Sequence, residues 1–117
     1  MNQVFDTDNL QWNQIQHHGV EADESIGWSN GLQVRTAIYR LGAGKKIPQH
    51  AHEGWVHVAV LQGEMEFETQ EHGKQRIGAG HHYYVEPGQS HYESAPDCET
   101  IILLTHAFKP GMTVQDA

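Results

Sequence analysis

Residues 42–63 read GAGKKIPQHAHEGWVHVAVLQG: a glycine-rich turn, a closely spaced pair of histidines, and an apolar run that ends at Gly63. Comparable runs rich in Val, Ile, Leu, Phe and Tyr lie on both sides of this stretch. Gly, Pro and Asn separate them, which is typical of antiparallel β structure. None of the runs keeps a helical period, so the sequence predicts an all-β chain. The predicted strands are Leu32–Leu41, Trp55–Leu61, Glu64–Thr69, His82–Val85 and Thr100–Phe108.

The predicted strands differ in how their two faces are composed. Glu64–Thr69 alternates, with Met65 and Phe67 on one face and glutamates on the other, which predicts a half-buried strand with an acidic, solvated face. Val58–Leu61 and Ile101–Leu104 are instead apolar on both faces. Such strands are covered on both sides by a second sheet or a partner subunit, so we expect a homodimer.

The length of 117 residues suits a single domain. We expect residues 1–31 to form a leading segment, with one short strand or turn, that packs on a β-barrel of residues 32–117.

The composition excludes several partners. The formal net charge of −8 opposes binding to nucleic acid or to an anionic membrane surface. No apolar run approaches the length of a membrane span, and the N-terminal residues do not resemble a secretory signal. The sequence therefore favours a cytoplasmic protein that binds a small molecule.

Histidine is the residue type that points to chemistry. Cys98 is the only cysteine, so no thiolate cluster can form, and a metal would need nitrogen and oxygen ligands. Among ten histidines, His50 and His52 lie two residues apart. In an extended strand such residues share a face, roughly 6 to 7 Å apart at Cα. The two rings can converge on one divalent ion, Fe, Zn, Ni or Mn, if another strand supplies a third ligand.

The spacing of these residues resembles the two sequence motifs of the cupin family, over most of the chain. The first motif runs from a glycine through five residues to His-x-His and ends at a further glycine. The second runs from a glycine through a Pro-Gly turn to a histidine. The matching positions are Gly44, His50, His52 and Gly63 in the first motif, and Gly80, Pro87, Gly88 and His91 in the second.

This resemblance implies an antiparallel double-stranded β-helix, or jelly-roll barrel, that holds one divalent metal ion with His50, His52 and His91. The family usually adds a glutamate at the position of Val56, so that ligand is missing here. Three neutral imidazoles leave open positions on the metal, as in some cupin dioxygenases. The motif region is also similar to small cupins of sugar-acid metabolism.

The resemblance leaves two functions open. We expect an enzyme of the isomerase, lyase or dioxygenase type that acts on a small polar metabolite. The alternative is a non-catalytic binding or sensing cupin, in which the three histidines line a pocket with or without a metal.

Other side chains near the motifs have two interpretations each. His57 follows Val56 and faces away from the site unless a β-bulge near Trp55 reverses the strand. Glu93 shares the face of His91 and is either a general base or spare ligand, or a solvated glutamate, which we favour. His106 is a pocket residue or an ordinary buried histidine. The remaining histidines are expected at the surface: His17, His18, His72, His81 and His82.

Overall fold

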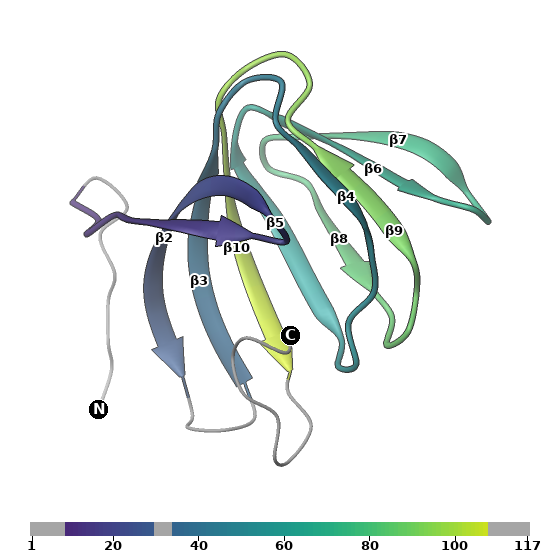
Figure 1. Ribbon diagram of the computed structural model, residues 1–117, viewed down its shortest axis with the longest axis horizontal. Helices are drawn as coiled ribbons and strands as arrows, with labels where there is room; N and C mark the ends of the chain where they lie inside the picture. Colours follow the sequence, from purple (N-terminus) through teal and green to yellow (C-terminus); the bar gives the residue numbers. More distant parts are fainter. Residues whose placement is uncertain (1–8, 30–33, 108–117) are drawn as a thin grey trace.

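The computed structural model describes residues 9–29 and 34–107, which form antiparallel strands (Figure 1). Within these ranges no helix is long and apolar enough to cross a membrane. The strands are β1 (Asn13–His17), β2 (Val20–Ser29), β3 (Val34–Leu41), β4 (Lys46–His50), β5 (Val56–Gln62), β6 (Glu64–Thr69), β7 (Gly73–Gly78), β8 (His82–Val85), β9 (His91–Ser94) and β10 (Thr100–Ala107).

The strands are arranged in two sheets that enclose one apolar core (Figure 1). The larger sheet has the order β1-β2-β3-β10-β5-β8 and the smaller has the order β4-β9-β6-β7. This arrangement confirms the predicted all-β antiparallel jelly roll. The core residues are Ala22, Ala37, Tyr39, Leu41, Ile47, Val56, Val58, Val60, Met65, Phe67, Tyr83, Val85, Ala95, Ile102 and Leu104.

The two strands that are apolar on both faces lie side by side in the larger sheet. Their inward residues, such as Val58 and Ile102, are buried in the core. Their outward residues are less covered, and Leu61 is 43% exposed. Within the chain these strands are therefore fully buried on one face only.

The N-terminal region differs most from the sequence prediction. In place of one short strand or turn it contributes β1 and β2, and β2 pairs with β3 from Asp23 to Ser29. The hairpin turns at His18 and Gly19, whose φ angles are 50° and 82°. A two-residue turn with both φ angles positive matches the right-handed twist of the flanking strands. Residues 32, 33 and 108 of the predicted strands lie outside the described residues.

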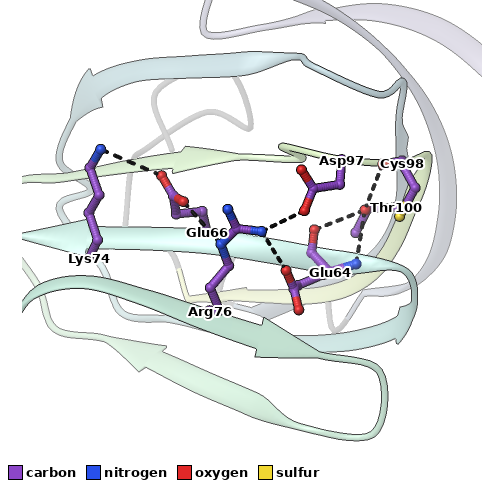
Figure 2. A network of polar contacts seen from close by, with 7 residues as sticks. All are labelled: Glu64, Glu66, Lys74, Arg76, Asp97, Cys98 and Thr100. Carbon is purple, nitrogen blue, oxygen red and sulfur yellow. Dashed lines mark hydrogen bonds and ion pairs between the residues drawn. The ribbon is translucent and has the colours of Figure 1, made fainter.

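The β6–β7 hairpin has the predicted alternation, with Met65 and Phe67 buried. Its acidic face is not simply solvated, because Arg76 on β7 contacts Glu64 at 2.7 Å and Glu66 at 3.2 Å (Figure 2). The same guanidinium contacts Asp97 at 2.6 Å, in the loop before β10. These contacts fasten the edge hairpin of the smaller sheet to the loop that enters the larger sheet.

Gly63 makes the sharp turn by which the chain passes from β5 to β6. Its φ is 81°, and a Cβ atom here would lie 2.6 Å from both the Glu99 carbonyl oxygen and Thr100 Oγ1. The Thr100 hydroxyl accepts a hydrogen bond from the Glu64 amide and donates one to the Glu64 carbonyl (Figure 2). The glycine that ends the first motif thus has a structural role in joining the two sheets.

Candidate metal site

The predicted ligands meet at one end of the smaller sheet. His50 is the last residue of β4, His91 is the first residue of β9, and the antiparallel register pairs them directly. His52 lies two residues beyond the end of β4. The ring centroids are 4.2 Å apart for His50 and His91, 4.9 Å for His50 and His52, and 5.3 Å for His52 and His91. The structure therefore brings the three predicted histidines together.

Two of these separations, 4.9 and 5.3 Å, fit rings around a single ion, and the His50–His91 separation of 4.2 Å is shorter. Imidazoles that bind one ion through nitrogens at about 2.1 Å have centroids roughly 4.6 to 5.3 Å apart. Within residues 9–29 and 34–107, the possible ligand atoms form two overlapping groups of three, each within 4.8 Å, and His50 belongs to both. One group joins His50 to His18 and His52, and the other joins it to His91 and Glu93. No single group therefore contains all three predicted ligands, His50, His52 and His91.

Backbone carbonyls fix the proton on two of the rings. His50 Nδ1 lies 2.7 Å from the Pro48 carbonyl oxygen, and His91 Nδ1 lies 2.9 Å from that of Gln89. A carbonyl only accepts, so each Nδ1 carries a hydrogen, and Nε2 is the nitrogen that each ring presents to the site.

The site-facing nitrogens of His50 and His52 lack a hydrogen-bond partner. The Nε2 atom of His50 and the Nδ1 atom of His52 are buried without one, and the Nε2 atom of His91 meets only the Glu93 carboxylate, at 3.2 Å. A buried polar atom left in this way costs about 1 to 3 kcal/mol. A cation that accepts several lone pairs at once would satisfy these atoms, so the donor set fits a divalent metal.

Glu93 on β9 is the acidic member of the site, and the interpretation as a solvated glutamate is wrong. The residue is 6% exposed, and its Oε1 lies 3.2 Å from His91 Nε2 and 3.6 Å from His50 Nε2. The Tyr83 hydroxyl donates a hydrogen bond to Oε2. Burial alone would raise the pKa of Glu93, but the contacts with His91 and Tyr83 outweigh it and lower the pKa to about 2. The carboxylate is therefore ionised at neutral pH.

The pKa values of the site histidines are shifted in different directions. Burial lowers the pKa of His52 to about 4 and keeps that of His50 below its usual value. Burial also opposes the charged form of His91, but the Glu93 carboxylate outweighs it and raises the His91 pKa. At neutral pH His50 and His52 are therefore neutral, which is the form that binds metals.

Comparison with known proteins identifies the family. The family model of the ChrR cupin-like domain matches residues 1–109. The chain belongs to this cupin family. No curated protein matches the sequence.

Solved structures with the cupin fold match this chain at low sequence identity. The polyketide cyclase RemF from Streptomyces resistomycificus is 15% identical, with a TM-score of 0.79, over 99% of this chain and 89% of that one. KdgF from Halomonas sp. is 17% identical, with a TM-score of 0.75, over 92% and 95%. A chain in the complex of Rhodobacter sphaeroides SigE with the anti-sigma ChrR is 22% identical, with a TM-score of 0.70, over 86% and 51%. The predicted cupin jelly roll is confirmed.

Sequence reasoning missed two histidines of this cupin, because it placed His17 and His18 at the surface. Both are half-buried, and the His17 ring lies 5.1 Å from that of Tyr39. The His18 ring stacks on His50, with centroids 3.9 Å apart and planes 20° apart. The available signal was the pair His18-Gly19, since glycine and, to a lesser degree, histidine tolerate the positive φ of a tight hairpin turn.

The other candidate histidines lie on the sheet faces that the alternation of side chains along their strands gives them. His106 on β10 is buried, with its ring 5.4 Å from that of His52, so it lines the interior beside the site. His57 Nε2 instead lies 2.9 Å from His82 Nδ1 on the outer face of the larger sheet. The irregularity between β5 and β10 lies between Ile101 and Ile102, far from the start of β5, so the predicted orientation of His57 holds. The exposed histidines are His72, His81 and His82, as predicted.

A buried polar cluster continues the interior beyond the histidines. Arg35 on β3 pairs in register with His106, and its side chain is only 10% exposed. Its Nη2 lies 3.3 Å from a carboxylate oxygen of Glu24 and donates a hydrogen bond of 3.0 Å to the Tyr39 hydroxyl. A charged residue at an inward position of an apolar strand was the sequence signal for this cluster.

Proposed function

We propose that this cupin is an enzyme that holds one divalent metal ion with His50, His52 and His91 and acts on a small polar metabolite. The observation that carries the proposal is the convergence of buried histidine nitrogens beside the ends of β4 and β9, where those of His50 and His52 have no hydrogen-bond partner. Backbone carbonyls aim two of these nitrogens in the manner of metal-binding histidines. Iron, zinc, nickel and manganese all accept such ligands.

The side chains around the site suit a reaction that moves a proton. The bound ion would act as a Lewis acid toward a substrate oxygen or, as iron, support reaction with dioxygen. The Glu93 carboxylate lies beside His50 and His91, which places an oxygen where it can exchange a proton with a substrate or with water. Arg35 and His106, deeper in the interior, can orient a polar or anionic substrate group. We therefore propose an isomerase, lyase or dioxygenase.

Metal analysis after expression with added iron, zinc, nickel or manganese tests this proposal. We expect close to one metal ion per chain and its loss in the double variant His50→Ala, His52→Ala. His72→Ala, an exposed histidine on the β6–β7 hairpin, is the matched control and should retain the metal. A protein that takes up no metal under any loading would overturn the proposal.

The identity of the metal then separates the reaction classes. Iron together with substrate-dependent oxygen uptake supports a dioxygenase. Zinc or nickel without oxygen consumption supports an isomerase or lyase.

A non-catalytic sensing module is the second candidate function. It is favoured by the similarity to a chain from the SigE and anti-sigma ChrR complex, and by the apolar Val56 where a carboxylate usually stands. Such a module would bind its metal and a metabolite without converting it. Binding of a metabolite by calorimetry with unchanged metabolite recovered from the solution would support this function over the enzyme.

We further propose that two copies of the chain pack through the outer face of the larger sheet. Its central row of Ile38, Leu103 and Ala59 is apolar. Trp28, Tyr84 and Leu61 are exposed around this row. Light scattering should give the mass of a dimer for the wild type and of a monomer for Leu103→Glu, and a wild-type monomer would overturn the idea.

A further inference from the structure

The tip of the β1–β2 hairpin has an unusual backbone. His18 has a φ of 50°, and in residues 9–29 and 34–107 it is the one residue other than glycine with a positive φ. Glycine or asparagine adopts this conformation more readily than histidine does. A less favoured residue at a tight turn beside a functional site suggests a role for its side chain.

The hairpin directs the His18 ring to the metal site. The ring lies on His50 at 3.9 Å between centroids and approaches His52 edge-on at 5.5 Å. The possible ligand atoms of these three histidines all lie within 4.8 Å of one another. His18 is therefore as close to the site as the residues that the sequence motifs identify.

The position at which the cupin motif usually adds a glutamate ligand has no donor here. Val56, at the start of β5, is 3% exposed and belongs to the apolar core, so it contributes no ligand. It pairs in register with His106 on β10. Two other side chains come close enough to add a protein ligand. Glu93 on β9 lies in a group with His50 and His91, and His18 on the β1–β2 hairpin lies in the group that includes His52.

We propose that His18 is a fourth protein ligand, supplied by the β1–β2 hairpin to the metal ion of the proposed function, on which this inference rests. The planes of His18 and His50 are 20° apart in the stack, so His18 must turn about its side-chain bonds to reach the ion. The hairpin allows this adjustment, because β1 is an edge strand that pairs with β2 alone among the described strands. Metal binding then also anchors the hairpin to the barrel.

Two substitutions separate a ligand from a stacking residue. His18→Asn suits the positive φ but removes both the imidazole and the stack, whereas His18→Phe keeps an aromatic ring and removes the nitrogen donors. His72→Asn on the exposed β6–β7 hairpin is the matched control. Circular dichroism of the metal-free proteins checks that each variant folds.

The measurement is the dissociation constant for Co²⁺ by competition with a chelator, together with the visible absorption spectrum of the Co²⁺ protein. We expect both His18 variants to weaken binding by about 10- to 100-fold and to change the spectrum. The control should match the wild type. Unchanged affinity and spectrum in His18→Asn would overturn the inference, as would wild-type affinity in His18→Phe with a loss only in His18→Asn.

Hydrogen exchange gives an independent readout. Co²⁺ should slow the exchange of the β1 amides in the wild type and have no such effect in His18→Asn. Equal protection in both proteins contradicts anchoring by His18. A wild type that binds no Co²⁺ contradicts the proposed function itself, whereas a wild type that binds Co²⁺ equally well without His18 contradicts this inference alone.

Discussion

His50 and His91 are cross-strand partners, and each turns its Nδ1 toward the carbonyl oxygen of the residue two positions earlier. The sheet thus fixes both the distance between the two rings and the nitrogen that each presents. His52 and His18 lie on connecting segments, where the backbone leaves them more freedom. One half of the site is therefore pre-organised by β4 and β9, and the other half can adjust when an ion binds.

Replacing Glu93 by Gln should weaken metal binding and remove any proton-transfer activity. The amide keeps the shape of the side chain but carries no negative charge beside the nitrogens of His50 and His91. We expect the metal dissociation constant to rise by about tenfold or more, as measured by chelator competition.

Tyr83→Phe is to be compared with Glu93→Gln, because it removes only the hydroxyl that donates a hydrogen bond to Glu93. It should lower activity less than Glu93→Gln does and leave the metal content unchanged. If Glu93→Gln kept full activity, Glu93 would not be the base.

His57→Ala should leave the metal content and affinity unchanged. The side chain lies on the outer face of the larger sheet, in contact with His82 rather than with the site. Elemental analysis of the purified variant beside His91→Ala checks this: the first should match the wild type and the second should lose its metal. A loss in His57→Ala would mean that β5 is shifted by one residue from the register described.

The sequence was most informative where side chains alternate around the core. β6 was predicted over the same residues as in the structure, because Met65 and Phe67 point inward between glutamates. β7 was missed, because its lysine, glutamine and arginine leave no apolar face to detect. β4 and β9 were missed for the same reason, as their inward positions include His50, His91 and Glu93.

The site was predictable only as far as local spacing defines it. His50, His52 and His91 occupy motif positions, so their meeting followed from the resemblance. The approach of His18 to His50 depends on the path of a hairpin distant in sequence, which no local pattern contains. Glu93 was misjudged because its buried partner is Tyr83 on β8, a contact that the local spacing does not contain.

Arg35→Met should destabilise the fold, because it leaves the Glu24 carboxylate without its partner in a nearly buried position. Breaking a buried ion pair costs about 3 kcal/mol or more in the free energy of unfolding. The matched control is Arg40→Met, whose pair with Asp23 is about one-third exposed and should cost less than about 1 kcal/mol. Urea unfolding measures both, and equal costs would contradict the role assigned to burial.

Gly63→Ala should destabilise the fold by about 2 to 4 kcal/mol, because it combines an unfavourable backbone conformation with a steric clash. The φ of 81° disfavours any side chain, and the new Cβ would meet backbone and hydroxyl oxygens at 2.6 Å. Gly78→Ala is the control, since its φ is not positive and its Cβ would meet nothing within 4 Å. Urea unfolding of the two metal-free variants should therefore show a large loss only for Gly63→Ala. A loss for Gly63→Ala as small as that for Gly78→Ala would mean that the β5–β6 turn tolerates a side chain, and that the motif glycine has another role.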